Sequence, residues 1–236
     1  MINKITIKGE RCSGTNYLFN LIQSNFNIES SFLGWKHGYL NTYSDDLINE
    51  DFLTIVITRN VYDWIQSFHE NPHHIKRRYA FIDGKVKIHI EDFSKFIRSS
   101  VYAITDDGKE LIRERHPFTL EFPKNPIELR NLKNENFLNF KKVIKNLHYI
   151  KYEDLKNDTE NQLNIINDKF LHKKFKFKNW DNYKDQNYKF EEKKRFRMTE
   201  EDFNFILDNL NWDLENQLGW TKDDIKNIHQ NKNILI

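Results

Sequence analysis

The sequence predicts an α/β domain in which helices enclose a central parallel sheet in a three-layer sandwich. Two apolar runs, residues 5–8 and 52–58, have the composition of strands. The second run is continuous and β-branched, as is typical of a central parallel strand buried on both faces. A segment with helical spacing follows each run, at 15–25 and at 62–69. Strands that alternate with helices in this way indicate a parallel sheet.

The rest of the chain supplies further elements of the same kind. The expected elements are an extended segment at 31–35, a hairpin turning at Asp83-Gly84, a helix near 92–102, a loop with Pro117, Pro123 and Pro126, helical spacing at 137–147, a strand at 148–152, a helix to about Leu171, and a helix N-capped by Thr199. At 236 residues, we expect one domain spanning 1–236, with an insertion at about 70–130.

Composition limits the classes of function. The formal net charge is only +2, so no global field attracts nucleic acid or a membrane surface. A single cysteine excludes an intrachain disulfide and is consistent with a reducing compartment. The first strand begins too early for a signal peptide, and no run approaches the ~20 apolar residues of a membrane helix. We therefore expect a soluble, cytoplasmic protein without a nucleic-acid partner or membrane insertion.

The most informative segment is residues 9–16, Gly-Glu-Arg-Cys-Ser-Gly-Thr-Asn, which joins the first strand to the first helix. Two glycines separated by four residues form the frame of a P-loop, whose backbone amides bind phosphate. A triphosphate loop continues with Lys and then Ser or Thr for Mg²⁺, whereas this chain has Thr15 and Asn16. The segment therefore favours a phosphorylated nucleotide other than a magnesium triphosphate. The alternative is that both glycines serve only the turn. In either case, Thr15 is expected to cap the helix.

Other polar residues are expected at the same edge of the sheet. Ligands of parallel α/β sheets bind at the carboxyl ends of the strands. Arg59 directly follows the strand at 52–58, and Lys36-His37 lies between the two strands. We expect these residues and the loop at 9–16 to lie together.

Taken in order, these segments resemble the sulfotransferases that use 3′-phosphoadenosine 5′-phosphosulfate (PAPS). The family's Arg/Lys-Ser-Gly-Thr-Thr core is similar to Arg11-Cys12-Ser13-Gly14-Thr15-Asn16. Its Arg-[Asn/Asp]-Pro-x-Asp-x₃-Ser segment is similar to residues 59–67, with the spacing from Arg59 to Ser67 kept. Tyr-Glu-Asp-Leu at 152–155 and Leu-Gly-Trp at 218–220 also resemble family segments.

The resemblance implies a role for each matching residue. The loop residues Arg11, Cys12, Ser13, Gly14, Thr15 and Asn16 would bind the 5′-phosphosulfate of PAPS. Arg59 and Ser67 would bind the 3′-phosphate. Lys36 would stabilise the leaving nucleotide, and His37 would remove the acceptor's proton. The enzyme would sulfate a hydroxyl or amine of a small molecule or glycan without a metal, and the insertion at 70–130 would form the acceptor side.

Two departures from the family pattern concern the loop. Cys12 stands where the family has its basic residue, with Arg11 one position earlier, so the cation that meets the sulfonate is open. Asn16 replaces the second Thr, although its amide can also donate a hydrogen bond.

Each of these assignments has an alternative. Lys36 is otherwise a solvated lysine, His37 a turn histidine bonded to backbone, Arg59 a partner of Asp63, and Ser67 a helix-surface serine. The basic run Lys193-Lys194-Arg195-Phe196-Arg197 either completes the 3′-phosphate site or is a solvated face. His69, His73 and His74 suit the acceptor cleft better than a metal site. Tyr152-Glu153-Asp154 either contacts the nucleotide or caps the next helix. The competing functions are a P-loop kinase and a non-catalytic nucleotide-binding module.

Overall fold

The computed structural model describes residues 2–31, 33–40, 50–70, 79–82, 85–88, 92–101, 114–182, 189 and 195–232. The chain divides into two compact units, each built from two stretches. Unit 1 comprises Met1–Asn60 and Asn136–Lys194, and unit 2 comprises Val61–Glu135 and Arg195–Ile236. The expected single domain with an insertion at 70–130 stays a prediction.

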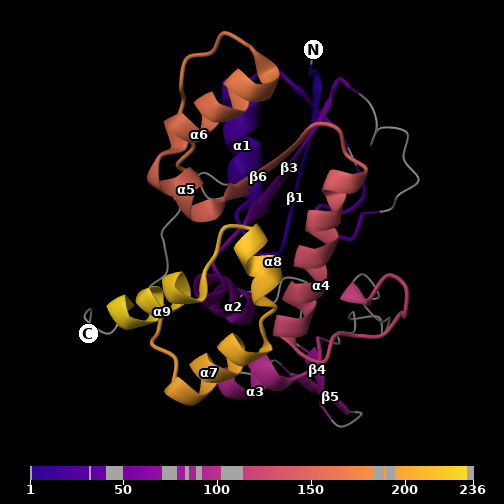
Figure 1. Ribbon diagram of the computed structural model, residues 1–236, viewed down its shortest axis with the longest axis vertical. Helices are drawn as coiled ribbons and strands as arrows, with labels where there is room; N and C mark the ends of the chain where they lie inside the picture. Colours follow the sequence, from indigo (N-terminus) through magenta and orange to yellow (C-terminus); the bar gives the residue numbers. More distant parts are fainter. Residues whose placement is uncertain are drawn as a thin grey trace. The chain divides into compact units, whose positions relative to one another are not determined.

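Unit 1 contains a four-stranded parallel sheet, as the sequence predicts (Figure 1). Its strands are β1 (Lys4–Gly9), β2 (Glu29–Ser30), β3 (Phe52–Thr58) and β6 (Leu147–Lys151), in the order β2-β1-β3-β6. β3 has the predicted bounds and all seven of its residues are buried, in agreement with a central position. An extended segment was expected at 31–35. The strand that pairs with β1 lies just before it, since Glu29 and Ser30 pair with Lys4 and Ile5.

Both faces of this sheet are covered by apolar side chains. Strand alternation sends Leu53, Ile55 and Ile57 of β3 to one face and Phe52 and Val56 to the other. The first face packs against α1 (Thr15–Asn25), α5 (Tyr152–Asn157), α6 (Thr159–Ile166) and the π-helical turn Asn167–Leu171. Figure 1 shows α1, α5 and α6 on one side of the strands. The second face packs against residues that include Leu33, Phe137, Phe140 and Ile144. This arrangement is consistent with three layers.

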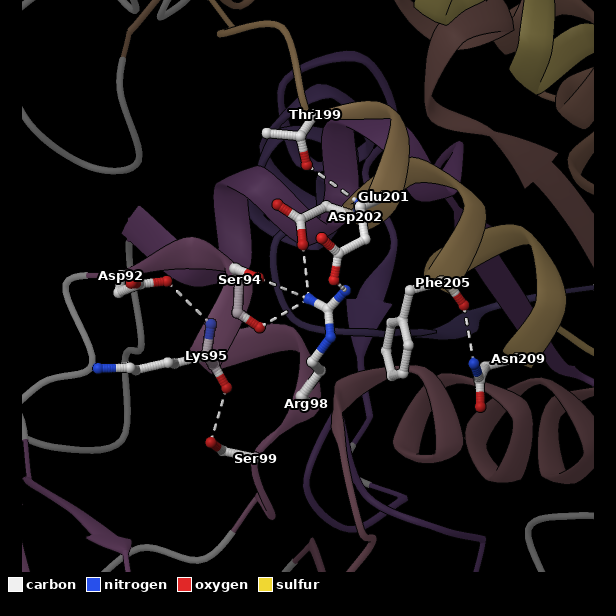
Figure 2. Close-up of polar contacts among 10 residues, drawn as sticks. All are labelled: Asp92, Ser94, Lys95, Arg98, Ser99, Thr199, Glu201, Asp202, Phe205 and Asn209. Carbon is white, nitrogen blue, oxygen red and sulfur yellow. Dashed lines mark hydrogen bonds and ion pairs between the residues drawn. The ribbon is translucent and has the colours of Figure 1, made fainter.

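Unit 2 is mostly helical in its described part. Its elements are α2 (Val61–Glu70), β4 (Tyr79–Ile82), β5 (Lys85–Ile88), α3 (Phe93–Arg98), α7 (Glu200–Asn209), α8 (Trp212–Gln217), α9 (Lys222–Asn231) and most of α4 (Pro126–Asn139). β4 and β5 pair antiparallel as the expected hairpin does, while its turn at Asp83-Gly84 lies outside the described residues. The predicted cap of α7 is confirmed, since the Thr199 hydroxyl accepts the Asp202 amide at 3.1 Å (Figure 2).

The expected helix at 137–147 is wrong. α4 ends at Asn139, a 3₁₀ turn covers Phe140–Lys142, and Leu147 already belongs to β6. The helix instead begins at Pro126, which was expected in a loop, because proline is tolerated in the first turn. Apolar spacing did not reveal α4, since charged and amide side chains, Arg130, Lys133 and Asn134, occupy buried positions on it.

Smaller differences concern element ends. α3 covers only Phe93–Arg98, where a helix near 92–102 was expected, and Asp92 caps it by accepting the Lys95 amide at 2.9 Å. β6 ends at Lys151, so Tyr152 opens α5 rather than closing the strand. Within the described part of the chain, no helix has both the length and the apolar character to cross a bilayer.

Candidate functional site

The two glycines of the segment at 9–16 occupy positions where a side chain does not fit. A Cβ on Gly9 would lie 2.4 Å from the Ile57 carbonyl oxygen and 2.7 Å from the Ser13 hydroxyl. A Cβ on Gly14 would lie 2.4 Å from the Tyr152 ring, and Gly14 has a φ of 95° in the left-handed region. The glycines therefore permit both the turn and the close packing of the loop against β3 and α5.

The start of α1 differs from the prediction that Thr15 caps it. The N-cap is Gly14, which has no side chain to accept an amide, and Thr15 is the first, buried residue of the helix. The first turn therefore has no side-chain cap, and it contains no acidic residue. A helix N-terminus in this state carries the partial positive charge that favours an anion.

Ser13 and Cys12 shape the loop from within. Ser13 is fully buried, and its hydroxyl donates to the Glu10 carbonyl oxygen at 2.6 Å. Its amide donates to the same oxygen at 3.3 Å. Cys12 has a φ of 61°, which reverses the chain between Arg11 and Ser13. The structure thus gives Ser13 a role in closing the loop.

Both predicted catalytic residues contact this loop. The Gly9 amide donates to the Lys36 carbonyl oxygen at 3.1 Å, and His37 Nδ1 lies 2.8 Å from the Gly9 carbonyl oxygen. A carbonyl oxygen only accepts, so Nδ1 is the protonated nitrogen and Nε2 of the neutral ring carries the lone pair. The Lys36 ammonium donates to the Asn16 side-chain oxygen. His37 is therefore held in the tautomer that a base acting through Nε2 requires.

Arg11 and Trp35 stack next to these residues. The Arg11 guanidinium lies over the Trp35 indole, 4.3 Å from the ring centre. The Trp35 ring meets the His37 ring edge-on, with 5.3 Å between centroids. In the sequence, Trp35 directly precedes Lys36-His37, which indicates an aromatic side chain beside the two predicted catalytic residues.

Arg59 reaches the loop from the carboxyl end of β3. Its Nη1 donates to the Cys12 carbonyl oxygen at 3.2 Å, and its guanidinium lies 4.8 Å from the centre of the Tyr152 ring. The alternative partner, Asp63, accepts a hydrogen bond from Lys232 within unit 2.

The next residue, Asn60, is bound by Glu153, while the expected contact of Tyr152-Glu153-Asp154 with the nucleotide stays a prediction. Glu153 Oε1 accepts the Asn60 backbone amide at 3.0 Å and also its side-chain amide. Burial raises the pKa of Glu153, and the hydrogen bonds from Asn60 oppose this rise. Glu153 thus fixes the backbone directly after Arg59.

Strand order explains why these segments meet. From β1 the chain passes through α1 to β2 on one side, whereas β3 is followed in the sheet by β6 on the other side. The strand order therefore changes direction between β1 and β3, and parallel α/β sheets bind their ligands at the carboxyl ends of strands at such a point. The segment at 9–16 and Arg59 lie at this point, as predicted.

The other predicted residues belong to unit 2 or lie outside the described residues. Ser67 is buried in α2 of unit 2, and His69 packs against the Phe93 and Phe96 rings. Arg195 pairs with Glu70 at 3.0 Å and Arg197 with Glu200 at 3.3 Å, while Lys193, Lys194, His73 and His74 lie outside the described residues. A search of the described residues finds no group of three or more metal-ligating side chains.

The arrangement in unit 1 has the chemistry of an anion site with an adjacent base. An uncapped helix N-terminus, Lys36 and Arg59 supply positive charge, and His37 supplies a proton acceptor. Neither models of known protein families nor the curated proteins give a match to this chain.

Proposed function

We propose that this protein is a PAPS-dependent sulfotransferase built on a P-loop-like nucleotide-binding fold. One observation carries the proposal: Lys36, His37 and Arg59, which come from two separate stretches of the chain, each bond to the segment at 9–16. Their partners are Asn16, Gly9 and Cys12, respectively.

The residues fit a doubly phosphorylated donor. Lys36 donates to the Asn16 side-chain oxygen and Arg59 to the Cys12 carbonyl oxygen, so both cations are held at the segment at 9–16. Asn16, at the position of the metal-binding hydroxyl of a triphosphate loop, instead orients Lys36. When bound, PAPS supplies a sulfuryl group on a phosphate leaving group. The amides at the start of α1 would hold its 5′-phosphosulfate, and Arg59 its 3′-phosphate.

His37 and Lys36 have complementary roles in the transfer. His37 Nε2 accepts the proton of the acceptor hydroxyl or amine, while Nδ1–H keeps its bond to the Gly9 carbonyl oxygen. The Lys36 ammonium offsets the negative charge that develops on the leaving oxygen. Trp35, edge-on to His37, offers an aromatic surface for a small-molecule or glycan acceptor.

Ligand choice tests the proposal against a kinase. Thermal unfolding should be compared with 3′-phosphoadenosine 5′-phosphate (PAP), adenosine 3′-phosphate, AMP and ATP–Mg²⁺. At a hundredfold excess over its Kd, PAP should stabilise the fold by about 2.7 kcal/mol, and ATP–Mg²⁺ by clearly less at the same concentration. Equal or larger stabilisation by ATP–Mg²⁺ would overturn the proposal in favour of a kinase.

Turnover separates an enzyme from a binding module. PAPS consumption should be followed with a pool of phenols, sugars and amines, with His37→Ala as the inactive control. Binding of PAP with no consumption of PAPS above that control would favour the non-catalytic module.

A further inference from the structure

Lys8 is a charged side chain buried within the sheet of unit 1. It lies on β1, paired in register with Val56 of β3, and its relative exposure is 0%. Val56 belongs to the cluster on the second face of the sheet, so Lys8 lies on the same face. An ammonium group removed from water is costly unless hydrogen bonds replace its hydration. Its retention therefore calls for a specific set of acceptors.

The ammonium binds the segment that carries both predicted catalytic residues. Lys8 Nζ donates to the Leu33 carbonyl oxygen and, at 3.2 Å, to the Trp35 carbonyl oxygen. Residues 33–37 are in turns and irregular backbone, so no strand pairing holds them to β1. A long side chain that reaches out from β1 replaces that pairing.

The contacts continue at the next residue of β1. The Gly9 amide donates to the Lys36 carbonyl oxygen, and the Gly9 carbonyl oxygen accepts from His37. Two consecutive residues of β1 thus bind this segment: Lys8 binds residues 33 and 35, and Gly9 binds residues 36 and 37. A shift of this segment away from β1 would break the His37–Gly9 bond that selects the tautomer.

We propose that Lys8 is a positioning residue, which holds residues 33–37 so that His37 keeps its Nδ1–H tautomer and Lys36 reaches Asn16. The catalytic consequence rests on the proposed sulfotransferase function, whereas the positioning itself does not. Lysine suits this role because its straight chain reaches the segment and its ammonium carries three donors for backbone oxygens.

The test compares Lys8→Met with a matched control, Thr54→Val. Met keeps the length of the side chain and removes the donors. Thr54 is fully buried on the same face of β3, and its hydroxyl has no hydrogen-bond partner among the described residues. Thr54→Val therefore removes a buried polar group from the same sheet without removing a described hydrogen bond to residues 33–37. ¹⁵N NMR of the His37 ring and amide hydrogen exchange at Gly9 report on both variants.

In Lys8→Met, we expect Gly9 exchange to accelerate by about tenfold or more and the Nε2–H tautomer of His37 to become detectable. We expect kcat for PAPS consumption to fall by roughly 10–100-fold, as for other outer residues that orient a reacting group, with the Kd of PAP within about threefold. Thr54→Val should leave all four quantities near wild type. The proposal is wrong if both variants behave alike, or if Lys8→Met changes PAP affinity as much as kcat.

A measurement on the unaltered chain covers the case in which Lys8→Met does not fold. The Nζ protons of a clamped Lys8 should exchange slowly enough to be seen in ¹H–¹⁵N spectra and should show contacts to Leu33 and Trp35. Exchange as fast as that of surface lysines such as Lys145 would overturn the proposal. If PAP fails to bind the wild-type chain, the proposed function fails, while the tautomer and exchange results still decide the role of Lys8.

Discussion

Two buried cations of unit 2 pair with carboxylates, whereas the hydrogen bonds given above for three cations at the site in unit 1 end on carbonyl or amide oxygens. In unit 2, Arg130 and Glu215 are 0% and 1% exposed and form a two-pronged ion pair, with Nε–Oε1 at 2.5 Å and Nη2–Oε2 at 2.8 Å. Lys133 likewise meets Glu114 at 3.0 Å with both side chains buried. At the site in unit 1, the bonds described for Lys8, Lys36 and Arg59 run to neutral carbonyl or amide oxygens.

The buried ion pairs of unit 2 are expected to serve stability, whereas Lys36 and Arg59 in unit 1 are the cations proposed to bind a ligand. A carboxylate cancels the field of its cation, and breaking such a buried pair leaves an uncompensated charge. Substitutions in unit 2 should therefore reduce stability, and those at the loop of unit 1 should reduce binding or turnover.

The largest effect is expected at His37. His37→Ala removes the base and should lower kcat by about 10²–10⁴-fold, with the affinity for PAP nearly unchanged. The acidic limb of the pH profile of kcat should disappear. His37→Asn is the matched variant, because its amide can still donate to the Gly9 carbonyl oxygen but cannot act as a base. Near wild-type turnover in either variant would place the base elsewhere, with His69 as the next residue to test.

The next effect concerns the buried ion pair of unit 2. Arg130→Met leaves Glu215 charged, buried and without its main partner, so the free energy of unfolding should fall by about 3–5 kcal/mol. Urea denaturation measures this loss. The double variant Arg130→Met/Glu215→Leu removes both charges and should recover most of the stability. A single variant as stable as wild type would remove the distinction between the units.

Arg59 is expected to affect binding by an intermediate amount. Arg59→Ala should weaken PAP binding by about 2–4 kcal/mol, as for a charge-assisted phosphate contact, and should hardly change binding of an analogue without the 3′-phosphate. Isothermal titration of both ligands measures the difference. Arg59→Lys keeps the charge without the planar fork and should fall between wild type and Arg59→Ala. Equal losses for the two ligands would mean that Arg59 acts by holding the loop at Cys12.

The smallest effect is expected for the partly exposed cluster in Figure 2. Arg98 donates to Asp202 at 2.5 Å and to Glu201 at 3.3 Å, and 30% of its side chain is exposed. Arg98→Met should therefore reduce the free energy of unfolding by only about 1 kcal/mol at neutral pH.

The pH dependence of that loss follows from Asp202. Burial raises the pKa of Asp202, but hydrogen bonds from Arg98, Ser94 and Thr199 outweigh it and lower the pKa below the ordinary 3.8. A lowered pKa stabilises the folded state above the unfolded value, and this stabilisation disappears as the pH falls through the folded value. The stability difference between wild type and Arg98→Met should thus shrink below about pH 3.8. A difference that stays constant between pH 7 and pH 3 would contradict this assignment.

The sequence alone predicted the elements whose information is local. The apolar run at 52–58 and the helical spacing at 15–25 match β3 and α1, and the Thr199 cap is confirmed. These features can be recognised locally, because apolar periodicity and an N-cap each involve only residues that are close together in the sequence. α4 escaped prediction, because its buried positions include Arg130, Lys133 and Asn134 rather than an apolar stripe. Arg130 and Lys133 are buried as ion pairs with Glu215 and Glu114, which lie on other segments of the chain, so their burial cannot be recognised from local sequence.

The same distinction holds for the site. Gly-x₄-Gly, Lys36-His37 and Arg59 were identified from residue type and order, and the common edge of the sheet followed from strand alternation. Only the tertiary structure shows the hydrogen-bond partners of these residues. They determine the tautomer of His37, the orientation of Lys36, and the roles of Ser13 and Glu153. Lys8 appears in the sequence as an ordinary lysine at the end of a strand. Its contacts with residues 33 and 35 depend on how an irregular segment lies against β1, which local sequence does not encode.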